Sequence, residues 1–185
     1  FAYDEQPYAM DTVVVGGDPN ATVEGLIIQE LDQNQNLLFQ WRSWDHFHVL
    51  DNIYIDTLGN QFPFIHCNAI DLDFDGHFLI SSRNLDEITK IHRTNGQVIW
   101  RWGGSQNEFN FINDYPFTYQ HCIRSLGNNR YILYDNGNFR IWDVDQFKEF
   151  AYVKNFNGSN TTSYEAAYQH AKQFFTINST YQLKG

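Results

Sequence analysis

Residues 66–104 read HCNAIDLDFDGHFLISSRNLDEITKIHRTNGQVIWRWGG, and this stretch decides the fold class. Four short runs in it are rich in apolar and β-branched residues, which is typical of strands; they are 68–74, 77–82, 87–92 and 97–102. Asp75-Gly76 separates the first two runs and Asn95-Gly96 the last two, and both dipeptides favour tight hairpin turns. Four antiparallel strands within about 40 residues are the pattern of one β-propeller blade.

The pattern recurs downstream. His66 stands before the first strand, and His121 stands in a similar place about 55 residues later. The strands expected in this second copy are 122–126, 130–134, 139–144 and 149–153. A repeated β-unit that presents a histidine each time predicts several histidines around one axis.

Upstream, residues 25–32 and 37–42 flank a polar turn and predict a hairpin. Residues 13–15, all valine, predict a further short strand. Trp41-Arg42 and Trp100-Arg101 then take the same place on the last strand of successive units. We therefore expect blades at 10–43, 66–104 and 119–155, followed by a tail at 156–185 in which residues 163–175 form either a short helix or an outer strand.

The predicted fold is all-β, with about three propeller blades of four antiparallel strands. A propeller needs four or more blades to close. Three blades alone leave unpaired strand edges, which are a liability. The chain is therefore expected to be part of a larger propeller, or to close by association with other copies of itself.

Composition narrows the class of protein. The 185 residues can bury one core, and the formal net charge of -10 repels a nucleic-acid backbone. No apolar run is long enough to span a membrane. We expect a secreted, extracellular or periplasmic protein. Four glycosylation sequons agree with this location, at Asn20, Asn157, Asn160 and Asn178.

Several of these segments, in this order, resemble the arylsulfotransferase family of β-propellers. They are Gly25–Asp32, Trp41–His46, His66–Asp71, Asp75–Asn84, Glu87–Ile91, Gly96–Gly104, Gln120-His121 and Asp135–Asn138. The resemblance implies a six-bladed propeller. It also implies sulfuryl transfer from a phenolic sulfate donor to a phenol acceptor, with no cofactor and no nucleotide sulfate.

The resemblance assigns roles to particular residues. His121 is expected to be the nucleophile that becomes transiently sulfated, while His66 and Arg83 hold the sulfuryl group. The other expected contributors are His46 and, as substrate contacts, Asn68 and Arg124. The family pattern has an acidic residue after the Gln-His pair, whereas Cys122 stands there in this chain.

These roles agree with elementary chemistry. The guanidinium of Arg83 is planar and permanently charged, which suits it to the oxygens of a sulfuryl group. A neutral imidazole is a good nucleophile near neutral pH, and a covalent intermediate divides the reaction into two easier steps.

Other interpretations of the same residues remain open. The chain is alternatively a non-catalytic secreted or surface propeller used for binding or assembly, with inert histidines near its axis. Arg83 either binds the sulfuryl group or pairs with Asp86 or Glu87 as a surface ion pair. Cys67 and Cys122 are either free or bridged.

Metal sites are not expected. Residues 71–76 (DLDFDG) resemble the start of a calcium loop, but Ser82 takes the position of the closing glutamate. His46 and His48 share a face of an extended chain, and no third ligand accompanies them. The five tryptophans are expected to pack between blades.

Overall fold

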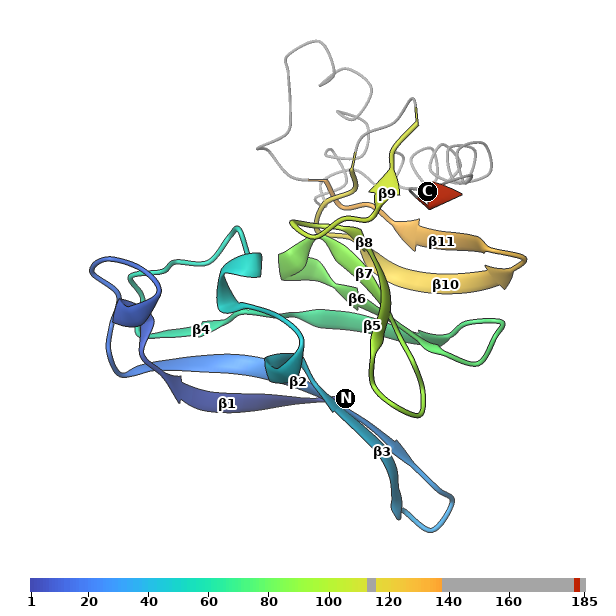
Figure 1. Ribbon diagram of the computed structural model, residues 1–185, viewed down its shortest axis with the longest axis horizontal. Coiled ribbons are helices and arrows are strands. Elements are labelled where there is room, and N and C mark those ends of the chain that lie inside the picture. Colours follow the sequence, from blue (N-terminus) through green and yellow to red (C-terminus); the bar gives the residue numbers. More distant parts are fainter. Residues whose placement is uncertain (113–115, 138–181, 184–185) are drawn as a thin grey trace, which may run out of the picture.

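The computed structural model describes residues 1–112, 116–137 and 182–183, and this part of the chain is all-β (Figure 1). Its only helices are single 3-10 turns, and none of them is long enough to cross a membrane. Three main sheets follow one another along the described residues, and two two-residue strands form a short fourth pairing. Their pairing is antiparallel apart from one short parallel contact.

The first sheet is built around a long central strand. Its members are β1 (Ala2–Tyr8), β2 (Ala21–Leu31), β3 (Leu37–Arg42) and β4 (Gln61–Pro63). β2 pairs antiparallel with β1 on one side and with β3 on the other, while β4 adds three parallel pairs. The β2–β3 hairpin confirms the predicted one.

The strand predicted at residues 13–15 is wrong. These valines follow the 3-10 turn η1 (Met10–Thr12), and the backbone N–H groups of Val13 and Val14 both donate to the Met10 carbonyl. A valine run forms a strand only where a partner strand offers hydrogen bonds. Here the N–H groups of Val13 and Val14 form hydrogen bonds within the turn and not with a partner strand.

The second sheet has four strands in the order β5-β6-β7-β8 and confirms the four strands predicted for residues 66–104. They are β5 (Cys67–Leu72), β6 (Phe78–Ser82), β7 (Glu87–Ile91) and β8 (Val98–Gly103). Gly76 and Gly96 have φ angles of +82° and +74°, in the region that favours glycine. The two hairpin turns therefore depend on the Asp-Gly and Asn-Gly dipeptides.

The third sheet is a hairpin of β10 (His121–Gly127) and β11 (Arg130–Tyr134). A two-residue strand, β9 (Phe109–Asn110), pairs with β12 (Gln182–Leu183). The strands predicted at 139–144 and 149–153, and residues 163–175 of the tail, lie outside the described residues.

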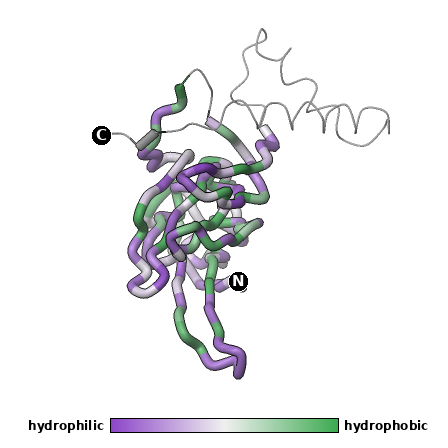
Figure 2. The backbone as a smooth tube through the Cα atoms, turned by 90° about the vertical axis from the view of Figure 1, so that its right-hand side faces the viewer, coloured by the Kyte–Doolittle hydropathy of each residue, from purple (hydrophilic) through white to green (hydrophobic). Residues whose placement is uncertain are grey.

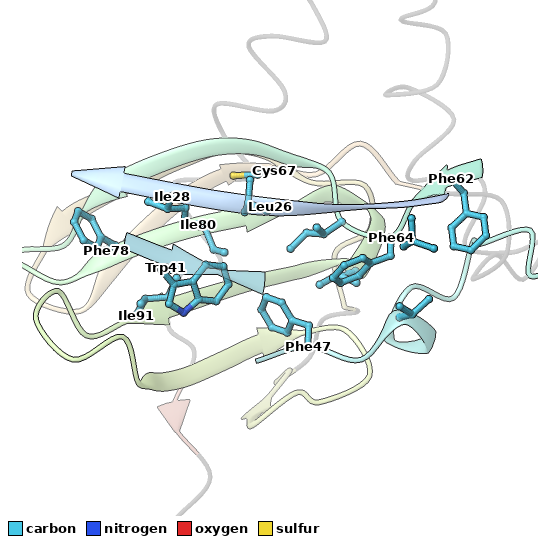
Figure 3. Close-up of a cluster of buried hydrophobic side chains, with 14 of the residues drawn as sticks. Leu26, Ile28, Trp41, Phe47, Phe62, Phe64, Cys67, Phe78, Ile80 and Ile91 are labelled. Carbon is cyan, nitrogen blue, oxygen red and sulfur yellow. The ribbon is translucent and has the colours of Figure 1, made fainter. Parts of the chain in front are cut away.

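The second sheet packs between the other two. One face of it contributes Phe78, Ile80 and Ile91 to a core shared with Leu26, Ile28 and Trp41 of the first sheet (Figure 3). The opposite face places Leu79, Ile88 and Trp102 against Ile123 and Leu133 of the third sheet. Every residue of β6 and β7 is buried as a result. Each fully buried large side chain contributes about 1.5–3 kcal/mol.

The β2–β3 hairpin extends away from these cores (Figures 1 and 2). Its turn, residues 32–36, is hydrophilic, and Asp32 accepts hydrogen bonds from the backbone of Asn34 and Asn36. The strands beside the turn expose Leu31, Leu37 and Leu38.

Polar contacts also tie the sheets together. Arg93, after β7, pairs with Glu30 of β2, and the Trp41 indole donates to the Gly96 carbonyl at 3.2 Å. Between the second and third sheets, Asp73 accepts from Tyr131 at 2.7 Å, and Lys90 Nζ, from the same sheet as Asp73, lies 2.6 Å from this carboxylate.

Candidate active site

His66 and Arg83 are placed together by the β5–β6 hairpin. His66 directly precedes β5, and Arg83 begins the 3-10 turn η4 (Arg83–Leu85) directly after β6. The first residue of β5, Cys67, pairs with the last residue of β6, Ser82. The Arg83 backbone N–H also donates to the His66 carbonyl at 2.7 Å. The side chains of His66 and Arg83 therefore leave the same end of the second sheet.

His121 lies at the corresponding end of the third sheet, where it pairs with Tyr134. In β5 and in β10 alike, the pairing slips by one residue immediately after this first pair. This shared bulge makes His121 the counterpart of Cys67, one residue beyond the place of His66. The two histidines are thus neighbours at equivalent strand ends, but they do not occupy the same repeat position.

Gln120 attaches the start of β10 to the second sheet. Its side chain is fully buried, and its amide nitrogen donates to the carbonyl of Glu87 at 2.9 Å and to that of Ser82 at 3.2 Å. The Gln120 carbonyl in turn accepts from the Asn68 amide at 2.7 Å. Asn68, which we expected to contact substrate, therefore uses its amide group to hold the strand that carries His121.

His66 lies near two other side chains that carry or can carry positive charge, Arg83 and His121. Partial burial lowers the pKa of His66 below its ordinary 6.5, and the charges of Arg83 and His121 lower it further. The sequence places these three residues far apart, and folding brings them close enough to act on one another electrostatically. Together these three residues favour the binding of an anion between them, and without a bound anion they favour the neutral form of His66.

The hydrogen bonding of His121 sets its tautomer. His121 Nδ1 lies 2.8 Å from the Tyr119 carbonyl oxygen, which can only accept a hydrogen bond. Nδ1 must therefore carry the proton in the neutral ring, and Nε2 keeps its lone pair. The Asn136 side-chain amide lies 3.3 Å from the same Nδ1, and its carbonyl oxygen fits that contact if the amide is turned over.

Among the described residues, no carboxylate is in direct contact with Arg83. Its guanidinium lies over the Tyr119 ring, 4.0 Å from the centroid, and donates to Asn84 Oδ1 at 3.1 Å. Glu87, one of the two acids proposed as its ion-pair partner, binds Arg101 at 2.8 Å. The other, Asp86, accepts from Tyr54 and from the Tyr119 backbone.

Two further expected residues make their contacts elsewhere. The His46 ring stacks on Trp41 with centroids 4.9 Å apart, and partial burial lowers its pKa. Arg124 is exposed, and its guanidinium donates to the Ile123 carbonyl at 2.6 Å. The structure brings neither side chain into contact with His66, Arg83 or His121.

Sequence reasoning missed Tyr3. Its hydroxyl lies 3.5 Å from His66 Nδ1 and donates to the Cys67 carbonyl at 3.3 Å, and its ring stacks on His66. Burial raises the Tyr3 pKa, so the phenol stays protonated and able to donate. No local signal marks this residue, because its place depends on the pairing of β1 with β2.

The remaining candidate sites have other partners. Asp73 and Asp75, from the calcium-like segment, both bind Lys90 Nζ at 2.6 Å. His48 caps the 3-10 turn η3 (Val49–Asp51) through its ring nitrogen. Across 1–112 and 116–137, no three potential ligands are grouped to hold a metal ion.

Both cysteines are free, with Cys67 buried and Cys122 exposed. Among the sequons, Asn20 is exposed to solvent. The other three, at Asn157, Asn160 and Asn178, lie outside the described residues.

Comparison with known proteins gives one match. No curated protein and no solved structure matches the chain. The model of the family described as arylsulfotransferase (ASST) matches residues 5–182, which is nearly the whole chain and includes each of the site residues above except Tyr3. The chain therefore belongs to the arylsulfotransferase family.

Proposed function

We propose that this protein transfers a sulfuryl group from a phenolic sulfate to a phenol through a sulfated His121. The observation that carries the proposal is the convergence of three residues from two sheets. Arg83 and His121 both act on the charge state of His66, and His121 is held with its Nε2 lone pair free.

In the first step, the His121 Nε2 lone pair attacks the sulfur of the aryl sulfate. A nitrogen–sulfur bond forms while the bond from sulfur to the phenolic oxygen breaks, and the electron pair of that bond leaves on the phenolate. The ring then carries a positive charge, which the Tyr119 carbonyl stabilises at Nδ1–H. The phenolate takes up a proton as it departs.

In the second step, the acceptor phenol loses its proton and its oxygen attacks the same sulfur. The nitrogen–sulfur bond breaks, and its electron pair returns to Nε2. No metal or redox partner enters this balance.

Arg83 and His66 stabilise the sulfuryl oxygens in both steps. The stacking of Arg83 on Tyr119 fixes the planar face of the guanidinium, and the N–H groups not used by Asn84 can donate to sulfuryl oxygens. The pKa of His66 is lowered by partial burial and further by the charges of Arg83 and His121, and a bound sulfate ester offsets the effect of those charges. His66 can then gain a proton beside the anion and release it when the product leaves, which suits the proton transfers of the two phenols.

The architecture is part of the proposal. We assign blades at 10–43, 66–104 and 119–155 of a propeller of the six-bladed type, with the site residues at the inner strand ends; the first sheet also includes β1 and β4, from outside 10–43. What supports this assignment is the face-to-face packing of successive sheets and the histidine-bearing first strands of the second and third sheets. We place the protein outside the cytoplasm, which agrees with its acidic charge and exposed Asn20.

The proposal is tested with 4-nitrophenyl sulfate as donor and phenol as acceptor, by following 4-nitrophenol release and phenyl sulfate formation. His121→Ala should abolish transfer, and Arg83→Gln should lower kcat by about 10²–10³-fold. His92→Ala is the matched control, because within the described residues the ring of this half-buried turn histidine packs on His77 and bonds within its own turn, away from the candidate site. Undiminished transfer in His121→Ala, or none in the folded parent, would favour a propeller used for binding or assembly.

A further inference from the structure

Tyr119 has a strained backbone at the centre of the candidate site. Its φ angle is +49°, a left-handed conformation that is uncommon for an aromatic residue. Such a conformation persists only where surrounding contacts hold it, and it is common at functional sites. The segment is held on both sides of Tyr119, since Thr118 N–H donates to Asp135 at 3.1 Å and the Gln120 side chain is fully buried.

The strained residue contacts two members of the site by different groups. Its carbonyl oxygen lies 2.8 Å from His121 Nδ1, and its ring lies beneath the Arg83 guanidinium at 4.0 Å. The nucleophile and the residue expected to bind the sulfuryl oxygens are therefore both oriented by Tyr119.

Asp86 is the anchor of Tyr119. One oxygen of its buried carboxylate accepts from the Tyr119 N–H at 2.7 Å, and the other accepts from the Tyr54 hydroxyl. The Tyr54 ring stacks on the Tyr119 ring, with centroids 4.5 Å apart. Both carboxylate oxygens of Asp86 thus act on Tyr119, one directly and one through Tyr54.

We propose that Tyr119, held by Asp86, is a positioning residue that sets the tautomer of His121 and the place of Arg83 at the same time. The inference rests on the proposed function in one respect, that His121 attacks through Nε2. If the Asp86 bond is lost, the Tyr119 carbonyl is free to turn away from Nδ1. The imidazole then populates the tautomer with its proton on Nε2, which has no lone pair there for attack.

The experiment compares two pairs of variants in the full chain. Asp86→Gly removes the carboxylate and tolerates the φ angle of +52° at this position, while Asp86→Asn keeps an oxygen for the Tyr119 N–H. Tyr119→Leu removes the ring under Arg83, while Tyr119→Phe keeps it. The ring nitrogens of His121 are observed by ¹⁵N NMR without substrate, and transfer from 4-nitrophenyl sulfate is measured in parallel.

In the parent and in Asp86→Asn, His121 should carry its proton on Nδ1. Asp86→Gly should populate the other tautomer and lose about 10²-fold in kcat, the scale expected when a reacting group is misplaced. Tyr119→Leu should keep the parent tautomer, because its carbonyl remains, but transfer about tenfold more slowly with a raised KM for the donor. Tyr119→Phe should behave like the parent.

The NMR result stands whether or not the chain transfers sulfate, so failure of the proposed function is seen separately, as an inactive parent. A proton on Nε2 in the parent, or an unchanged tautomer in Asp86→Gly, would overturn the first half of the proposal. Equal donor KM in Tyr119→Leu and Tyr119→Phe would overturn the second. Should Asp86→Gly not fold, the parent tautomer and the Tyr119 pair still decide both halves.

Discussion

Replacing Lys90 with methionine removes the cation buried against Asp73, the carboxylate that ties the second sheet to the third. Lys90 Nζ lies 2.6 Å from both Asp73 and Asp75, and its side chain is only 6% exposed. Methionine keeps the length and the apolar stem but has no charge. Asp75, 36% exposed at its side chain, can return to solvent, whereas Asp73, with 0% exposed, cannot.

The loss of stability expected for Lys90→Met depends on the contacts that Asp73 retains. Removing one partner of a buried ion pair usually costs 3–5 kcal/mol, because the other charge stays buried. Asp73 keeps neutral donors in Tyr131, Ser125 and the Phe74 backbone, at 2.7–2.8 Å. We therefore expect a loss near the lower limit, about 3 kcal/mol in the free energy of unfolding. For a chain of this size that lowers Tm by roughly 6–12 °C.

Urea and thermal unfolding, followed by tryptophan fluorescence, measure the change. Arg93→Met is the matched control, since its ion pair with Glu30 has side-chain exposures of 41% and 22% and should be worth at most about 1 kcal/mol. Adding Asp73→Asn to Lys90→Met should recover part of the loss, because no buried charge remains. Equal losses for Lys90→Met and Arg93→Met would refute the reasoning.

Three further outcomes are expected. Gly25→Ala would place a Cβ 2.3 Å from Trp44 Nε1, so it should destabilise the first sheet by about 1–3 kcal/mol in thermal unfolding, and a Tm equal to that of the parent would contradict this. The pKa of His66 is lowered from 6.5 in the folded chain, so on acidification the unfolded state takes up this proton at a higher pH than the folded state does. The free energy of unfolding therefore falls as pH drops through 6.5. His66→Gln should flatten that slope of the urea midpoint against pH, and an unchanged slope would exclude His66 as its source. Iodoacetamide should modify exposed Cys122 in the native protein and Cys67 only after unfolding, because burial raises the Cys67 pKa to about 12. Peptide mass spectrometry measures the modification of both cysteines, and modification of Cys67 in the native protein would contradict its burial.

The second sheet could be predicted from sequence because each of its signals is local. Asp75-Gly76 and Asn95-Gly96 fix the turns, and the runs between them contain enough apolar residues to be buried on both faces. The strands fall within two residues of their predicted bounds.

The first strand could not be predicted in this way. β1 (Ala2–Tyr8) has no buried residue and contains Pro7, so neither its hydropathy nor its composition marks a strand. It is a strand because β2 offers it a full row of hydrogen bonds. The strand predicted at residues 13–15 is wrong for the same reason, since residues of high β-propensity do not form a strand without a partner strand.

The same difference between local and long-range signals separates the residues of the candidate site. His66, Arg83 and His121 could be named from motifs, because each lies at a predicted strand end. Tyr3 and Asp86 could not, since Tyr3 reaches His66 across 63 residues and Asp86 reaches Tyr119 across 33. These contacts depend on how successive sheets pack, which no local pattern in the chain encodes.

The most direct test of the account is to trap the sulfated histidine. The parent chain is incubated with 4-nitrophenyl sulfate without acceptor, quenched rapidly in alkali to preserve a nitrogen–sulfur bond, digested and analysed by mass spectrometry. We expect one added SO₃ group on the peptide that contains His121, lost on addition of phenol and absent in His121→Ala. Transfer of sulfate to phenol with no such adduct, or with the adduct on another residue, would contradict the central claim.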